Sequence, residues 1–343
     1  MNNRNINIDI MKSLALFFVI GVHFFLYTGF YELNYNFFVF FFIIIRNIML
    51  TCVPLFIITT GFLNRNKIWS KKYYLNILYI YSLYSFSIFI LTVNDENFDL
   101  SYQLFRKVVI NILEYKYYGW YINMYVGLML IAPIINIAFK YMEEKKQYFA
   151  IFNIIIAISL PITLFDFFLD ARYSLFSNLF PNWWNKSWPL IYYAIGVYFS
   201  YKKERIRYAL SMLISALLIG GISYYYFNIH FESVVYGNIF CVVTSLCIFN
   251  ILLNIKVKLG NICLVLVKFI STNTLIAYLL SHIVDASIYP YLTKLIPNIH
   301  IRLSMFPVVV IFNFLITIFL VFMVVMLMGV LKKLKYFSIL RKT

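Results

Sequence analysis

Long apolar runs alternate with short charged segments along most of the chain. An apolar helix of about 20 residues is long enough to cross a bilayer, whose hydrocarbon core is about 30 Å thick. The pattern predicts spans near residues 13–30, 37–62, 73–92, 121–139, 148–169, 188–200, 208–227, 236–255, 266–288 and 306–331. The run at 188–200 is short, so we expect its helix to begin earlier. The predicted fold class is all-α, a polytopic membrane bundle of about ten transmembrane helices.

The composition supports a membrane protein. Hydrophobic residues make up 63% of the chain and charged residues only 12%. A soluble domain has about 25% charged residues, so this chain lacks the polar surface that water requires. We predict a single integral-membrane domain over residues 1–343 with no appended soluble domain. The first apolar run is full-length and has no small-residue cleavage site, so no cleavable signal peptide is expected.

The basic residues predict the orientation of the chain. The formal net charge is +16, from 29 Lys and Arg against 13 Asp and Glu. If the N-terminus is inside, most of these basic residues fall in segments on the cytoplasmic side, as the positive-inside rule requires. We therefore expect both ends in the cytoplasm. The expected location is the plasma membrane of a bacterial cell, with several passes of the chain. Nucleic-acid binding is less favoured, because the basic residues lie in short loops between spans.

The cysteines indicate neither a disulfide nor a metal site. All four lie in or beside apolar runs, and no two have CxxC spacing. The composition thus gives no sign of a bound metal or of a disulfide framework.

One histidine is placed for chemistry inside the first predicted span. His23 follows Lys12 by 11 residues, which is about three helical turns and about 16 Å of helix. The two side chains therefore lie on nearly the same face, with Lys12 at the cytoplasmic mouth. A titratable imidazole at that depth suits proton transfer. The alternative is a structural histidine satisfied by its neighbours.

Other ionisable residues within predicted spans are further candidates, because charge in a membrane is costly. Arg46 lies inside the second span, where a guanidinium needs a carboxylate, a phosphate or carbonyl groups. His282 lies in the ninth span near Asp285, and Asp166 lies near the outer end of the fifth. Each of them either contacts a substrate or serves the structure.

Two further sets of residues have both a functional and a structural interpretation. Lys71 and Lys72, at the inner end of the third span, are topology signals or contacts for a phosphate group. Trp120 and Tyr121 either form part of an interfacial aromatic belt or line an outer sugar-binding vestibule. The half-apolar stretch from Leu104 to Leu113 is expected along the membrane surface.

Four ordered motifs resemble those of a known family, the integral-membrane acyltransferases of the acyltransferase-3 type. The first is a basic residue, ten intervening positions and a histidine, here Lys12 and His23. The second is Arg46 followed by Cys52-Val53-Pro54-Leu55-Phe56-Ile57-Ile58-Thr59-Thr60-Gly61-Phe62-Leu63, similar to the family's Val-Pro-Leu-Phe element. The third is Trp120-Tyr121 with Gly127-Leu128 and Pro133, and the fourth runs from Ser271 to His282.

The sequence departs from the family pattern at three places. Thr60 stands where serine is usual, and Lys12 replaces the commoner arginine. The third span lacks the paired arginines of many members and has only Lys71 and Lys72 nearby. The donor-binding part of the resemblance is therefore weaker than the part that concerns the fold.

The resemblance implies transfer of an acyl group, most commonly acetyl from acetyl-CoA, to a hydroxyl of a surface polysaccharide or its lipid-linked precursor. It implies His23 as base, or as the carrier of an acyl-histidine intermediate, with Lys12 and Arg46 as catalytic partners. Lys71 and Lys72 would hold CoA phosphates, while Trp120, Tyr121, His282 and Asp166 would contact the acceptor. The alternatives are a flippase, polymerase or transporter for lipid-linked sugars and, third, a sensing protein without chemistry.

Overall fold

The computed structural model describes residues 4–33, 36–95, 102–114, 119–168, 182–202, 206–227 and 235–340, and these residues contain helices and no strands. The chain divides into two compact units. Unit 1 combines Met1–Asn34 with Lys258–Thr343, and unit 2 is Tyr35–Val257. The first helix of the chain therefore packs with the last helices, across a long intervening segment.

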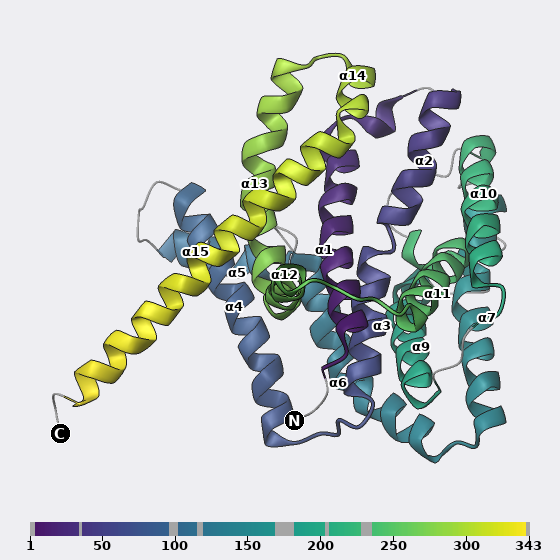
Figure 1. Ribbon diagram of the computed structural model, residues 1–343, viewed down its shortest axis with the longest axis horizontal. Coiled ribbons are helices and arrows are strands. Elements are labelled where there is room, and N and C mark those ends of the chain that lie inside the picture. Colours follow the sequence, from purple (N-terminus) through teal and green to yellow (C-terminus); the bar gives the residue numbers. More distant parts are fainter. Residues whose placement is uncertain are drawn as a thin grey trace. The chain divides into compact units, whose positions relative to one another are not determined.

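Unit 1 is built around α1, which packs against α12, α13 and α15. Figure 1 shows α1 and α13 side by side, with α12 seen nearly end on. The elements of unit 1 are α1 (Ile6–Tyr27), η1 (Phe30–Glu32), α12 (Asn261–Thr272), α13 (Thr274–Leu295), α14 (Ile299–Ser304) and α15 (Phe306–Leu340).

Unit 2 contains the remaining helices, among which α3 packs extensively on α9 and α10 on α11. Its elements are α2 (Phe37–Met49), α3 (Cys52–Asn64), α4 (Lys71–Asp95), α5 (Tyr102–Leu113), α6 (Gly119–Tyr141), α7 (Glu144–Phe168), η2 (Asn182–Ser187), α9 (Pro189–Tyr201), α10 (Ala209–Phe227), η3 (Val235–Gly237) and α11 (Ile239–Asn254).

The helices confirm a polytopic helical membrane protein. In the described part of the chain, seven helical segments are long and apolar enough to cross a membrane: Ile6–Tyr27, Phe37–Asn64, Lys71–Val93, Gly119–Tyr141, Glu144–Thr163, Thr274–Leu295 and Phe306–Gly329. Within the described residues, the predicted spans at 188–200, 208–227 and 236–255 form shorter apolar helices. Helices are therefore found at all the predicted positions, and seven of them reach the length of a full crossing.

Two predicted spans are each divided by a local break. The run at 37–62 forms α2 and α3, with Leu50 and Thr51 between them. Pro54 accounts for this break, because its ring conflicts with the carbonyl of Leu50 and it has no N–H to donate. The run at 266–288 is divided at Asn273, whose side chain donates to the Phe269 carbonyl at 2.8 Å. Such a local bond competes with continuation of the helix.

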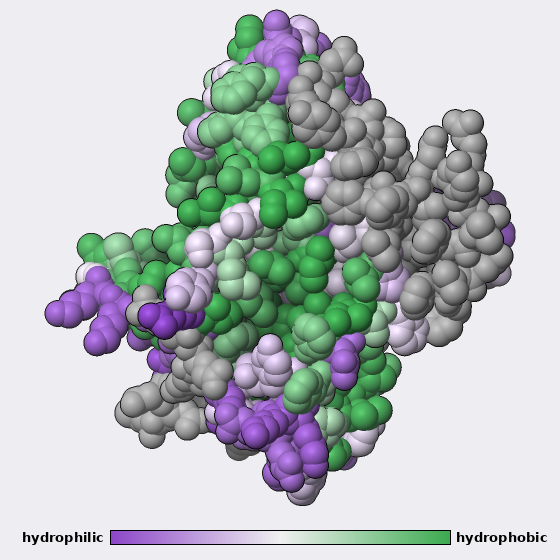
Figure 2. Space-filling model, turned by 90° about the vertical axis from the view of Figure 1, so that its right-hand side faces the viewer, coloured by the Kyte–Doolittle hydropathy of each residue, from purple (hydrophilic) through white to green (hydrophobic). Residues whose placement is uncertain are grey.

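The exposed surface of the long helices is apolar. On α15, Val308, Phe312, Leu315 and Phe319 are each more than half exposed. In Figure 2, green hydrophobic side chains cover much of the face shown, while most purple hydrophilic ones lie towards its edges. A surface of this kind is stable against lipid and would be unfavourable in water.

Helices α3 and α9 approach closely because a glycine faces the partner backbone on each side. A Cβ atom at Gly61 would overlap the backbone of Tyr193. A Cβ atom at Gly196 would overlap the Ile58 carbonyl and lie 2.8 Å from the Phe62 nitrogen. Small residues of this kind let membrane helices pack backbone to backbone.

The predicted half-apolar stretch forms helix α5. Its buried side consists of Leu104, Val108 and Asn111, and the Asn111 amide donates to Thr92 of α4 at 2.9 Å. Phe105, two-thirds exposed, lies on a different side of the helix. The location of α5 along the membrane surface stays a prediction.

Candidate active site

The side chain of His23 is hydrogen-bonded to an aspartate on another helix. His23 Nδ1, on α1, lies 2.7 Å from Asp285 Oδ2, on α13. His23 is 9% exposed and Asp285 only 2%. An ionised carboxylate only accepts hydrogen bonds, so this contact favours the His23 tautomer that has its proton on Nδ1 and its lone pair on Nε2. The pair therefore has the tautomer and the fixed orientation that a general base requires.

A second hydrogen bond fixes the carboxylate of Asp285. The Asn313 amide, on α15, donates to Asp285 Oδ1 at 2.7 Å. The Thr317 hydroxyl lies 3.4 Å from Asn313 Oδ1 and donates to the Asn313 carbonyl at 2.9 Å. Asn313 and Thr317 are fully buried. Three helices thus position one imidazole through a continuous polar network.

Aromatic side chains enclose this network one turn further along α1 and α13. Tyr289 stacks on Tyr27 with ring centroids 5.5 Å apart, and Phe24 meets Tyr289 edge to face at 6.2 Å. The hydroxyl of Tyr289 is buried near the side chain of Asn313, but no hydrogen bond of good geometry joins it to the described residues. A poorly paired hydroxyl beside the histidine makes Tyr289 a further candidate for contact with a substrate.

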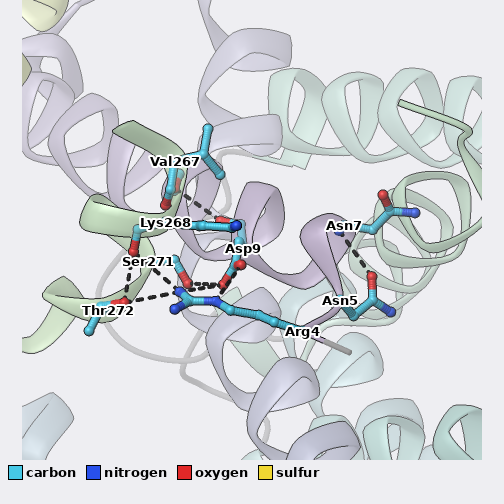
Figure 3. Close-up of polar contacts among 9 residues, drawn as sticks. Arg4, Asn5, Asn7, Asp9, Val267, Lys268, Ser271 and Thr272 are labelled. Carbon is cyan, nitrogen blue, oxygen red and sulfur yellow. Dashed lines mark hydrogen bonds and ion pairs between the residues drawn. The ribbon is translucent and has the colours of Figure 1, made fainter. Parts of the chain in front are cut away.

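A second polar cluster holds the beginning of α1 against the end of α12 (Figure 3). Asp9 receives the Arg4 guanidinium in a two-point contact, at 2.7 and 2.9 Å, and the Ser271 hydroxyl at 2.6 Å. Arg4 also donates to Thr272 at 3.0 Å and to the Lys268 carbonyl at 3.2 Å. The hydrogen bond to Asp9 raises the pKa of Arg4 above its ordinary value.

Lys12 and His23 both lie within α1, as the spacing predicts. Lys12 is partly buried and has interactions with other residues. Its position between the Asp9 cluster and His23 follows from the helix itself, with about 16 Å of axis separating it from His23. Its catalytic role stays a prediction.

Arg46 lies in the last turn of α2 and is 3% exposed. Its Nη1 atom donates to Asn47 Oδ1 at 3.3 Å, and it has further interactions. A cation near the C-terminal end of α2 is favourable because the helix dipole is negative there. Burial of the guanidinium is confirmed, and its role in catalysis stays a prediction.

The basic residues before and at the start of α4 lie close enough to affect one another. Lys71 and Lys72 open the helix and are exposed. Lys67 is exposed, yet partial desolvation by its neighbours, and secondly the charge of Lys72, lower its pKa. The Asn136 amide holds this segment through the carbonyls of Asn64 and Lys67, at 2.9 and 2.8 Å. An anion beside these ammonium groups would relieve their mutual repulsion.

The predicted aromatic residues of α6 belong to a stack within unit 2. Trp120 lies on one side of Tyr236, with ring centroids 5.8 Å apart, and Trp188 lies 5.0 Å from the same ring. Trp120 is 37% exposed. Tyr121 contacts Phe56 of α3 at 6.3 Å. Contact of either residue with an acceptor stays a prediction.

The structure describes the side chain of His282 but not that of Asp166. His282 lies on α13, three residues before Asp285, and is partly buried. The histidine that bonds Asp285 is nevertheless His23, from the first helix of the chain. Asp166 lies within α7, but its side chain is outside the described residues.

Sequence reasoning missed Asp285 and Asn313 as functional residues. In the sequence Asp285 stands out only as a neighbour of His282, although an acidic residue inside an apolar span is itself a signal. Asn313 gives a weaker signal, because a single amide in a long apolar run is common at helix contacts.

These observations define the protein as a multi-pass helical membrane protein with a buried histidine–aspartate pair. A family model described as an acyltransferase domain, of the acyltransferase-3 type, matches residues 5–329. The match covers nearly the whole chain, and the protein belongs to this family of acyltransferases. It is therefore an enzyme that transfers acyl groups other than aminoacyl groups. Neither curated proteins nor solved structures gave a significant match.

Proposed function

We propose that this acyltransferase moves an acetyl group from cytoplasmic acetyl-CoA to a hydroxyl of a surface polysaccharide or its lipid-linked precursor. The observation that carries the proposal is the 2.7 Å bond between His23 and Asp285. Acyl transfer to a hydroxyl needs a base, and a histidine oriented by a carboxylate is a recurrent way to provide one. The proposed location is a bacterial plasma membrane, with both ends of the chain in the cytoplasm.

His23 acts first on the acceptor hydroxyl in the proposed mechanism. Nε2 accepts the hydroxyl proton while the oxygen attacks the carbonyl carbon of the thioester. The carbon–sulfur bond then breaks, and the imidazolium returns the proton to the departing CoA thiolate. Asp285 stabilises the imidazolium while it carries this proton. The step needs no further reactant, because acyl-CoA supplies the acyl group and leaves as the CoA thiol.

A second route uses the same residue as a nucleophile. His23 Nε2 would attack the thioester and carry the acyl group before the hydroxyl receives it. Asp285 supports this route equally, because it keeps the lone pair on Nε2. Trapping a labelled acyl group on His23 from acetyl-CoA without acceptor would distinguish this route from direct transfer.

Basic residues are proposed to bind the donor. CoA carries several phosphate charges, and lysine ammonium groups bind phosphate as point charges. Lys71 and Lys72 are exposed at the start of α4, beside Lys67 with its lowered pKa. Lys12 and Arg46 are proposed as further positive groups, the second to stabilise the developing oxyanion.

Acceptor binding is proposed at aromatic and polar residues. The partly exposed ring of Trp120, stacked on Tyr236, offers a flat apolar surface of the kind that sugar rings contact. Tyr121, His282 and Asp166 complete the proposed acceptor contacts.

Chemical analysis of the host's surface glycan tests the proposal. We would compare wild type, a deletion strain, and the deletion strain carrying His23→Ala or His300→Ala, the second altering an exposed histidine. We expect O-acyl groups to disappear in the deletion and with His23→Ala, and to return with His300→Ala at unchanged glycan length. Normal acylation of a truncated glycan, or loss of the glycan itself, in the deletion strain would instead favour a flippase, polymerase or transporter and would refute the acceptor assignment.

A further inference from the structure

Arg302 of α14 is a buried cation at the ends of two helices. In the sequence it lies in a short segment between the last two predicted spans. The structure buries it, with 7% of its surface exposed. Burying a guanidinium is costly unless its N–H groups donate hydrogen bonds to other atoms, so the acceptors around Arg302 determine why it is buried.

The guanidinium binds backbone carbonyls from two helices. Nη2 donates to the Thr28 carbonyl at 3.0 Å, directly after α1. Nη1 donates to the Ile296 carbonyl at 3.0 Å, directly after α13, and lies 3.4 Å from the Thr293 carbonyl in its last turn. Nε has no partner among the described residues. One side chain thus joins the C-terminal ends of α1 and α13.

The electrostatics favour this arrangement. The carbonyls in the last turn of a helix have no partners within the helix, and they carry the negative end of its dipole. A cation that bonds both ends neutralises both and opposes the separation of the two helices. Lysine has a compact ammonium group and would not reproduce the planar fork that reaches carbonyls on two sides.

The same two helices carry the proposed base and its partner. His23 lies five residues before Thr28, which is about 8 Å along α1, and Asp285 lies eight residues before Thr293, about 12 Å along α13. A shift of either helix at this end therefore changes the distance between His23 Nδ1 and Asp285 Oδ2. At 2.7 Å that bond tolerates little displacement before it is lost.

We propose that Arg302 is a positioning residue that holds α1 and α13 in the register required by the bond between His23 and Asp285. The proposal rests on the function proposed above, because the bond matters for transfer only if His23 is the base. Arg302 does not touch the reacting atoms, and its effect on transfer is exerted through the tautomer and orientation of His23.

The test measures the histidine tautomer directly. The chain has four histidines, so protein labelled with ¹⁵N-histidine gives few signals, and His23→Gln identifies the one from His23. Wild type should show a single tautomer with the proton on Nδ1. Arg302→Met should show a mixture of tautomers, and Arg302→Lys an intermediate change. Lys294→Gln, which removes an exposed charge from the last turn of α13, should leave the signal unchanged.

Kinetics with acetyl-CoA and the host glycan provide the second measurement. Displacement of a catalytic group by about 1 Å costs about 100-fold in rate, so kcat should fall by about that factor in Arg302→Met with KM for acetyl-CoA unchanged. A folded Arg302→Met protein with the wild-type tautomer would refute the proposal. If that variant does not fold, a wild-type tautomer in Arg302→Lys would refute it.

The two readouts separate failure of this inference from failure of the proposed function. Suppose that the wild-type protein transfers no acyl group to the glycan, but that Arg302→Met changes the tautomer of His23. The positioning role of Arg302 would then stand, and the proposed acceptor would be wrong. If the wild-type protein transfers the acyl group normally and Arg302→Met leaves the tautomer of His23 unchanged, the proposed function would stand and the role of Arg302 would be wrong.

Discussion

His23 and Asp285 are 262 positions apart in the chain and are joined by a 2.7 Å hydrogen bond. The bond crosses from α1 to α13, and Asn313 of α15 holds the other carboxylate oxygen at 2.7 Å. The first and last helices of the chain therefore create one buried polar network inside unit 1. This network is the part of the molecule best suited to proton transfer.

Replacing Asp285 by asparagine should abolish most of the transfer activity while the fold is retained. An amide can donate to Nδ1 of His23, which favours the tautomer with the proton on Nε2 and removes the base. General base catalysis contributes about 10²–10⁴-fold, and a loss of that size in kcat is expected. Ser287→Ala, at an exposed position of the same helix, is the control and should keep wild-type kcat. A wild-type rate in Asp285→Asn would remove the aspartate from the mechanism.

Replacing Asn313 by leucine should weaken both stability and activity. The change leaves Asp285 Oδ1 without its 2.7 Å donor in a fully buried position. An unsatisfied buried group costs about 1–3 kcal/mol, and more when it is charged. We expect a lower Tm in detergent and a lower kcat. Thr317→Val should show a smaller effect of the same kind, and an unchanged Tm and kcat in Asn313→Leu would contradict the network.

The cluster at the start of α1 should show a graded order of effects on thermal stability. Asp9→Ala removes an acceptor that takes three hydrogen bonds and is 5% exposed, and bonds to a charged group contribute about 1.5–3 kcal/mol each. Ser271→Ala should cost less. Arg4→Gln should cost least, because its side chain is 46% exposed and screened by solvent. A Tm of Arg4→Gln below that of Asp9→Ala would contradict this description.

Adding a methyl group at the α3–α9 contact should destabilise the protein. Gly61→Ala and Gly196→Ala each place a Cβ atom against backbone of the partner helix, which cannot rotate away. Overpacking of this kind costs about 1–3 kcal/mol. Gly127→Ala is the matched control, because a Cβ atom there meets nothing within 4 Å. We expect a reduced Tm and yield for the first two variants and no loss for the third.

Removing the charge of Lys72 should change the pKa of Lys67. Partial desolvation is the larger cause of the lowered pKa of Lys67 and the charge of Lys72 the second. Lys72→Gln should therefore raise the pKa of Lys67 partway towards its ordinary value. Because only the neutral amine reacts, acylation of Lys67 by a small reagent at mildly alkaline pH should become slower, as measured by mass spectrometry. Lys145→Gln, at an exposed position, should leave that rate unchanged.

The sign of the stability effect of Lys67 follows from the same shift. A lysine whose folded-state pKa is lowered binds its proton less readily in the folded state than in the unfolded one. Its charged form therefore opposes folding at neutral pH, and stability rises as pH increases from the folded-state pKa towards 10.5, the ordinary value. Lys67→Met should reduce this pH dependence.

Local sequence was sufficient for the class of the protein and for part of the site. Apolar runs identify membrane helices because every buried backbone group must be satisfied within the helix itself. The spacing of Lys12 and His23 places both on one face because an α-helix has a fixed rise and turn per residue. Pro54 could also have predicted the break between α2 and α3, since its effect on the preceding turn is local.

Only the packing of distant helices decided which groups meet. Asp285 lies three residues from His282 in the sequence, yet its carboxylate binds His23 and Asn313 from two other helices. Arg302 has the sequence context of a loop charge, and burial against the ends of α1 and α13 gives it its contacts. Helical periodicity determines the face on which a side chain lies. Which face of another helix it contacts depends on the sum of many interactions between the helices, and no single segment of the sequence contains that information.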